Sequence, residues 1–223
     1  MFTNPFYHQT VRKTIIAFGS LFNNLYIVRK QDNNDVKIKV PIIYSTKEKF
    51  IQRYNDTLNR DNNDSIVLQT ILPRMGYEIG EIAYDPSRKK ISVNKRIIET
   101  EEGIRLNYTE VPYNVNIALT AYVRYVDDGL QIMEQILPFF TPDFTVAIKQ
   151  KVLNQPDEHM NIPFILNSVG QQTDYEGAMD ANSRMIMWTY NFTAKINLFG
   201  PLSDTGIIRY VDIDLLDMSE FNQ

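Results

Sequence analysis

The chain has 223 residues, of which 43% are hydrophobic and 22% are charged, and its net charge is -4. This composition is typical of a globular chain with a substantial core, and it excludes the disordered and fibrous classes. The absence of cysteine excludes disulfides, thiolate metal sites and cysteine nucleophiles. The two histidines, His8 and His159, are too few for a histidine-rich metal site. Composition therefore favours a non-enzymatic protein without a cofactor, assembled in a cytoplasmic environment.

The charge is distributed unevenly along the chain. Residues 1–105 carry 17 basic and 12 acidic residues, and residues 106–223 carry 6 basic and 15 acidic, which gives net charges of +5 and -9. Opposite fields orient association between copies or with stacked partners, and the alternative interpretation is a solvated surface. The only basic run, Arg88 to Lys90, is too short to predict sequence-specific nucleic-acid binding.

We expect neither a targeting signal nor a membrane-spanning segment in this sequence. The apolar stretch from Ile15 to Phe22 imitates a signal peptide, but Gly19 and Ser20 interrupt it and no small-residue cleavage site follows. A membrane helix needs roughly 20 apolar residues, and no segment approaches that length. We therefore expect no contact with a membrane.

The N-terminal region predicts a helix followed by a hairpin. Asn4 is a suitable cap and Pro5 a suitable first helical residue, and an apolar stripe continues to Phe22. Residues 25–29 and 36–40 then predict two short strands around a polar turn. In the second strand Lys37 and Lys39 alternate with Val and Ile, so we expect both lysines to point outward.

The next region predicts a second helix and then broken strands. Ser45 and Glu48 have the spacing of a capping box, and the apolar residues after them follow one helix face. From residue 67 to residue 99 prolines and glycines predict short strands. We expect residues 80–95 to form a protruding hairpin.

The second half contains the clearest strands. Apolar residues occupy alternate positions from Val115 to Tyr125 and from Ile186 to Leu198, which indicates an antiparallel sheet with one wet face. Residues 129–137 predict a short helix, and residues 143–148, 162–169 and 207–215 predict further strands. We expect a flexible polar loop at 170–183. The pattern predicts a single α+β domain over residues 1–223, with a mainly antiparallel sheet flanked by a few helices.

The motif with the most specific chemistry is Tyr125-Val126-Asp127-Asp128. Paired carboxylates of this form hold two divalent metal ions in reverse transcriptases, so a metal-dependent nucleotidyl transferase using Asp127 and Asp128 is one hypothesis. The acidic second half has no basic channel for a template. Asp128 with Gln131 also fits a capping box at a helix start, and this is the interpretation that we favour.

Several stretches together resemble the tail completion and sheath stabiliser proteins of T-even-type contractile-tailed phages. The resemblance runs from about residue 2 to about residue 200. The stretches are residues 25–50, Thr70 to Met75, Arg124 to Phe140 with Pro142 and Phe144, and Ser183 to Trp188.

The resemblance implies a structural virion protein that forms a hexameric ring at the junction of tail and neck. Such a ring caps the tail, stabilises the extended sheath and completes the tail for attachment to the head, after assembly in the host cytoplasm. The implied partners are the sheath protein, the tube terminator and the neck and head-completion proteins. A tube terminator or head–tail connector subunit of similar fold is the alternative.

Charged residues at strand positions are the candidates for contacts between subunits or with the sheath, because they alternate with apolar residues and so face outward. A solvated strand face is the alternative for each of them. The candidates are Lys37, Lys39, Asp212, Asp214 and Asp217.

Overall fold

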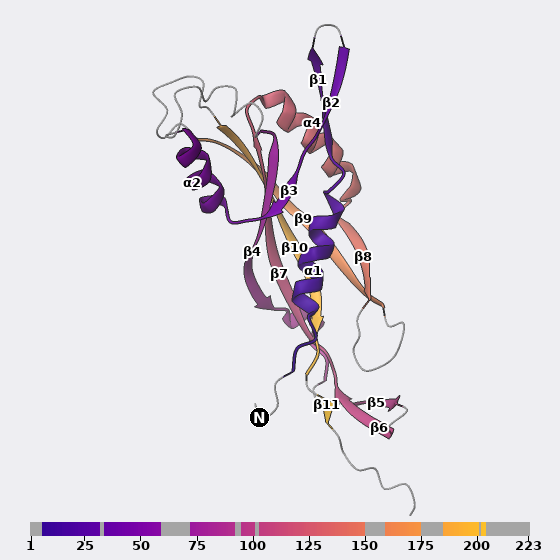
Figure 1. Ribbon diagram of the computed structural model, residues 1–223. Coiled ribbons are helices and arrows are strands. Elements are labelled where there is room, and N and C mark those ends of the chain that lie inside the picture. Colours follow the sequence, from indigo (N-terminus) through magenta and orange to yellow (C-terminus); the bar gives the residue numbers. More distant parts are fainter. Residues whose placement is uncertain are drawn as a thin grey trace, which may run out of the picture.

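A six-stranded sheet forms the centre of the molecule (Figure 1). The computed structural model describes residues 6–31, 34–58, 72–91, 95–100, 103–149, 159–174, 185–200 and 202–203. The strand order is β3-β4-β7-β10-β9-β8, and all neighbours are antiparallel except the short parallel pair β3 and β4. The strands are β3 (Ile42–Tyr44), β4 (Arg74–Tyr84), β7 (Val111–Val123), β8 (Asp143–Lys149), β9 (His159–Asp174) and β10 (Met185–Leu198). The predicted α+β class with a mainly antiparallel sheet is confirmed.

The two strands with regular alternation, β7 and β10, lie side by side in the middle of this sheet. The odd positions from Val115 to Val123 and the even positions from Ile186 to Ile196 are buried, as the pattern predicts. Tyr125 lies beyond the end of β7 and is 49% exposed, so the stripe ends one position earlier than we expected.

β4 differs from the sequence-based expectation because it is one continuous strand through Gly76 and Gly80. An added Cβ at Gly76 would lie 3.4 Å from the ring of Tyr122, an ordinary van der Waals distance, so the strand has no steric requirement for glycine here. The hairpin predicted for residues 80–95 is wrong in position, because the residues up to Tyr84 pair with β7. The paired strands come later, as β5 (Lys95–Thr100) and β6 (Gly103–Tyr108), with β11 (Leu202–Ser203) beside β6.

The loop predicted for residues 170–183 also begins later than expected. β9 continues through Gly170 to Asp174, pairing with β10 over this length, and residues 175–183 lie outside the described residues. Gly170 is paired with Thr189 of β10, so the glycine weakens the strand without ending it. The composition of residues 170–174 therefore predicted a loop, but pairing with the long strand β10 keeps these residues in a strand.

Two helices, α1 (Thr10–Leu21) and α4 (Val126–Ile136), pack on one face of the sheet (Figure 1). The ring of Phe18 on α1 is fully buried, and its centroid lies 5.0 to 5.6 Å from the centroids of four other aromatic rings. Edge-to-face and tilted contacts of this kind add to the free energy gained by burying apolar area. This aromatic cluster is the main core.

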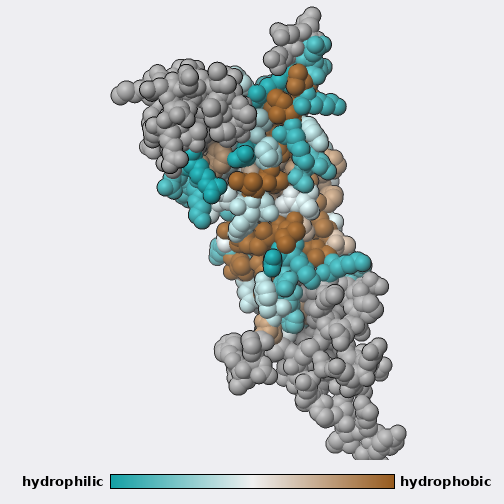
Figure 2. Space-filling model, viewed as in Figure 1, coloured by the Kyte–Doolittle hydropathy of each residue, from teal (hydrophilic) through white to brown (hydrophobic). Residues whose placement is uncertain are grey.

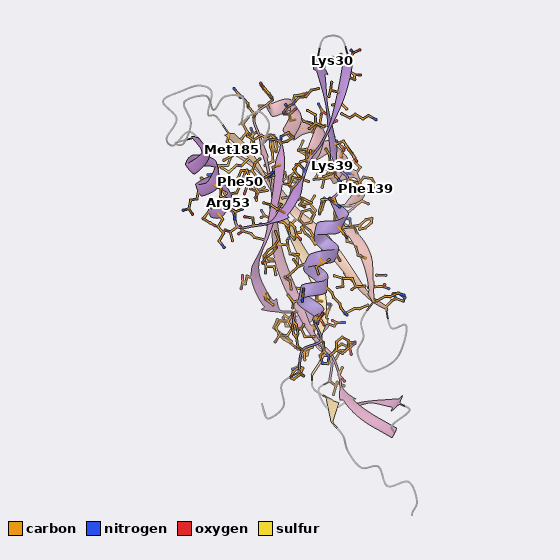
Figure 3. The ribbon with its side chains drawn as sticks, viewed as in Figure 1. Lys30, Lys39, Phe50, Arg53, Phe139 and Met185 are labelled. Atoms are coloured by element: carbon orange, nitrogen blue, oxygen red, sulfur yellow. The ribbon has the colours of Figure 1, made fainter. Side chains whose placement is uncertain are left out.

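The opposite face is covered at one end by α2 (Lys47–Leu58). Phe50 of α2 stacks on Tyr122 with 3.8 Å between ring centroids, and Met185 and Met187 close the same small cluster (Figure 3). The expectation that this face of β10 is wet is therefore wrong at its first residues. Alternation cannot reveal that a distant helix covers the second face.

The helix starts also differ by a few residues from the expected positions. α1 begins at Thr10 because Gln9 adopts a left-handed conformation, with φ of 59°; Asn4 and Pro5 lie outside the described residues. α2 begins at Lys47, and the Thr46 hydroxyl accepts the backbone N–H of Lys49 at 3.4 Å. Thr46 thus replaces Ser45 as the cap, so the predicted capping box is wrong by one residue.

The β1–β2 hairpin projects from one end of the molecule, as Figure 1 shows. It consists of β1 (Tyr26–Gln31) and β2 (Asn34–Lys39), paired antiparallel as a separate two-stranded sheet. Lys30 lies near its tip and Lys39 at its base (Figure 3). The hairpin predicted from the sequence is confirmed, and its position is set by contacts with α4.

Candidate interaction surface

An ion pair links the hairpin to α4. The guanidinium of Arg29 on β1 donates to both carboxylate oxygens of Asp128, at 3.2 Å from Nε and 2.6 Å from Nη2. The side chain of Asp128 is 3% exposed and that of Arg29 is 28% exposed. A two-pronged Arg–carboxylate contact fixes direction as well as distance, so it orients the hairpin on the helix.

Two glutamine side chains of α4 cover the outer edge of β1. The side chain of Gln131 accepts the N–H of Val28 at 2.8 Å and donates to the C=O of the same residue at 3.0 Å. One turn later, Gln135 donates to the C=O of Tyr26 at 2.8 Å. These amides take the place of a neighbouring strand, so α4 occupies that edge of the hairpin.

Helix α4 itself lies unusually close to the sheet at Gly129. An added Cβ at this position would lie 2.2 Å from Nε1 of the buried Trp188. Only glycine fits this approach without displacing the helix or the indole. The sequence from Asp128 to Gln131 thus combines an ion pair, a close approach and an edge contact within one helical turn.

The Asp pair serves this anchoring and neither of the roles predicted for it. α4 begins at Val126, so Asp128 is inside the helix and the predicted capping box with Gln131 is wrong; Gln131 donates to Asp127 instead, at 2.9 Å. Asp128 faces the cation of Arg29, which a metal ion would have to displace. Within the described ranges, no group of three or more His, Cys, Asp or Glu side chains is placed to hold a metal ion.

No pattern in the sequence singles out Arg29 or Gln135 for these contacts. Arg29 is separated from Asp128 by 99 residues, and no local pattern connects them. The spacing of Gln131 and Gln135, one helical turn apart, was the single available signal, because it places two long amides on one helix face.

Lys37 and Lys39 lie on the free side of the hairpin. Both side chains are exposed, as predicted. Lys37 is opposite Val28, whose N–H and C=O point toward α4, so the pair is of the type without mutual hydrogen bonds. The N–H and C=O of Lys37 therefore point away from β1. The same holds for Lys39, because its partner Tyr26 directs its C=O to Gln135.

This outer edge of β2 has no neighbouring strand in the part of the chain that the structure describes. Figure 2 shows hydrophilic and hydrophobic residues together on the hairpin. Val36 is 39% exposed and Ile38 is partly buried against the main core. The other predicted contact residues, Asp212, Asp214 and Asp217, lie outside the described residues, so their role stays a prediction.

An apolar pocket of about 210 Å³ lies near the base of the hairpin. Helices α1 and α4 and strand β8 contribute to its lining, and the ring of Phe139 at its border is 65% exposed (Figure 3). Its lining residues are Leu21, Phe22, Leu25, Gln135, Ile136, Phe139, Phe140 and Phe144. The lining offers hardly any polar group that could direct a reaction, so its chemistry is that of a packing site.

No helix within the described ranges has the length and apolar character required to cross a membrane. The described surface includes the outer edge of β2, exposed charged side chains and the apolar pocket. Strand edges and apolar pockets of this kind are surfaces on which other proteins dock.

Comparison with known proteins agrees with this description. The family described as T4-like virus Myoviridae tail sheath stabiliser matches residues 5–223. The chain is similar to the tail completion protein gp15 of Enterobacteria phage T4, with 28% identity over 207 residues, which cover 92% of this chain and 76% of the relative. These matches remove the nucleotidyl transferase hypothesis. The chain belongs to the family of T4-like tail sheath stabilisers, and it is a structural component of the virion tail and not an enzyme.

Proposed function

We propose that this protein forms a hexameric ring on top of the tail, where it stabilises the extended sheath and completes the tail for attachment to the head. The observation that carries this proposal is the family match over residues 5–223. The name of the phage T4 relative, tail completion protein, supports the second part of the role. The ring's location is the junction of tail and neck, and its subunits assemble in the host cytoplasm.

A ring requires that one surface of each subunit meets a different surface of its neighbour. The net charges of +5 and -9 in the two halves of the sequence support such a head-to-tail contact. We propose that each subunit is a single domain, with its sheet as the rigid body. Its partners are the sheath protein, the tube terminator and the neck and head-completion proteins.

Stabilisation of a sheath has a thermodynamic condition. A cap holds the extended state only if it binds that state more tightly than the contracted state, since a ligand with equal affinity for both shifts nothing. A rigid subunit meets this condition well, because it cannot adapt its surface to both arrangements. The continuous strands β7 and β10, packed against the aromatic core, supply that rigidity.

Electron microscopy of tails that lack their cap tests the proposal. Purified protein is mixed with such tails, and we expect ring-shaped density with sixfold symmetry on the uppermost sheath disc. Sheaths with the ring should stay extended longer under a contraction stimulus than sheaths without it. Density on the tube alone would instead support the tube terminator or connector alternative, and an absence of binding would contradict both.

A further inference from the structure

We propose that residues 211–215 of one copy add as a strand to the free edge of β2 in the neighbouring copy. This inference rests on the proposed ring and names the contact between its subunits. It uses a surface and a segment that the proposed function leaves unassigned: the outer edge of the hairpin and the acidic end of the chain.

The edge of β2 is ready to accept a strand. β1 takes up the inner side of β2, and the backbone groups of Lys37 and Lys39 point to the outer side. α4 and its glutamines hold the hairpin in place from the far side, so the edge is positioned before any partner arrives. Strand addition at such an edge is a recurrent mode of protein recognition.

The two sequences are complementary position by position. Val36-Lys37-Ile38-Lys39-Val40 meets Val211-Asp212-Ile213-Asp214-Leu215. Neighbouring strands share side-chain faces, so the aspartates come to lie beside the lysines and the apolar residues beside each other. The alternation is symmetric, and the charges therefore match whether the added strand runs parallel or antiparallel.

The lysines also restrict which strand the edge accepts. Lysine on an edge strand discourages pairing with ordinary strands and with a second copy of the same edge. An acidic strand removes that obstacle. Residues 204–223 contain five acidic residues and one basic residue, so the end of this chain has the required chemistry.

Geometry favours a neighbouring copy over the same chain. The last described strand, β11, lies at the opposite end of the molecule from the hairpin (Figure 1). The hairpin is held by α4, which rests on Trp188, and from Trp188 to Leu198 strand β10 rises about 33 Å before the chain reaches β11. From Ser203 to Val211 a fully extended chain spans at most about 28 Å. Residues 211–215 therefore fall short of the hairpin of their own copy.

Thiol cross-linking between two singly substituted proteins tests the contact directly. The chain has no cysteine, so each substitution introduces the sole thiol. We expect a short bismaleimide to join Lys37→Cys to Asp214→Cys if the strands are antiparallel, or to Asp212→Cys if they are parallel. At least a tenfold lower yield is expected for Lys89→Cys, an exposed control elsewhere on the surface, with the same aspartate variants. Equal cross-linking yields for Lys37→Cys and Lys89→Cys would overturn the inference.

Charge reversal provides the second test. Lys37→Glu with Lys39→Glu, or Asp212→Lys with Asp214→Lys, should raise the protein concentration needed for half-assembly at least tenfold in light scattering. Combining all four changes should restore it to within about threefold of the parent. The control pair Lys49→Glu and Lys89→Glu, which reverses the same amount of charge, should leave assembly unchanged. Circular dichroism checks that each variant is folded. The neutral pair Lys37→Gln and Lys39→Gln should raise the concentration needed for half-assembly by an intermediate amount.

The outcomes separate this inference from the proposed function. If the parent forms rings on sheath but reversal at Lys37 and Lys39 leaves assembly unchanged, the strand contact is wrong and the ring stands. If tails never carry a ring but the cross-link forms between copies, the contact stands and the proposed function fails. A cross-link found only within a doubly substituted chain, and never between two chains, would overturn the contact with a neighbour.

Discussion

The core beneath α1 is held together by aromatic rings, whereas the β1–β2 hairpin is held to α4 by an ion pair and amide hydrogen bonds. Around Phe18 the contacts are apolar and numerous, and no single one sets the geometry. At Arg29 and Asp128 two hydrogen bonds define one arrangement. Burial of apolar area supplies most of the stability of a domain, while satisfied polar contacts specify where an element lies. The hairpin thus gains a defined position, and among the described strands none covers its outer edge.

The largest effect is expected in the aromatic core. Phe18→Ala removes a fully buried ring, and the cavity that remains should lower the free energy of unfolding by about 4 kcal/mol. Urea denaturation followed by circular dichroism measures this. Ile16→Ala on the same helix is the control, because Ile16 is 58% exposed and its loss should cost less than about 0.5 kcal/mol. Similar midpoints for the two variants would contradict the assignment of the core.

The contact between α4 and the sheet is the next most sensitive position. Gly129→Ala places a Cβ within 2.2 Å of the Trp188 indole, so the helix must shift and the hairpin with it. We expect a loss of about 2 kcal/mol in urea denaturation and a changed fluorescence of the single tryptophan. Gly170→Ala is the matched control, since nothing lies within 4 Å of its added Cβ. A harmless Gly129→Ala would mean that the approach is looser than described.

The ion pair tests whether polar contacts position the hairpin. Asp128→Asn keeps the shape but removes the charge that faces Arg29, and we expect a loss of about 2 kcal/mol. Hydrogen exchange at the amides of β1 should accelerate at least tenfold, while exchange in β10 follows only the global change. Glu134→Gln on the same helix is the control, because Glu134 is exposed and takes no part in the contacts with the hairpin described above. Equal effects of the two variants would show that the ion pair does not position the hairpin.

A second polar contact, at Asp85, should give a smaller effect that depends on pH. Hydrogen bonds from the Ser87 hydroxyl and from the Arg88 guanidinium hold the pKa of Asp85 below its ordinary value of 3.8. A lowered pKa in the folded state contributes stability above the ordinary pKa and loses it as the pH falls below that value. Thermal melts from pH 5 to pH 2 should therefore decline less steeply for Asp85→Asn than for the parent. An identical decline would show that Asp85 contributes nothing to acid sensitivity.

The success of the sequence-based prediction followed the range of the interaction that decides each feature. The alternation in β7 and β10 is local, because side chains two residues apart share a face of a strand, and both strands were found. The hairpin from Tyr26 to Lys39 was found for the same reason. The role of Asp128 was missed, because its partner Arg29 lies 99 residues away in the chain. Capping was the best explanation that a single segment could offer.

Local composition also misled where a distant element overrides it. Glycines in β4 and β9 predicted interruptions, but β4 pairs with β7 on both sides of a register shift at Gly80, and β9 pairs with β10 at Gly170, so each strand continues. Alternation predicted that the second face of β10 is exposed to solvent, but α2 covers this face at Met185 and Met187. In these places the neighbouring element decides whether a residue is paired or buried, and that neighbour is remote in sequence.

Pattern and composition alone determined the α+β class, the central antiparallel strands and the hairpin with outward lysines, and several stretches of the sequence resemble tail sheath stabilisers. All of these rest on periodicity or on combinations of residues that are visible along the chain. Tertiary structure alone decided that Asp128 anchors Arg29, that Gln131 and Gln135 cover β1, and that no other described strand pairs with the opposite edge of β2. The physical reason is that an edge is free or covered only with respect to its neighbours in space, and here those neighbours come from a helix about a hundred residues further along the chain.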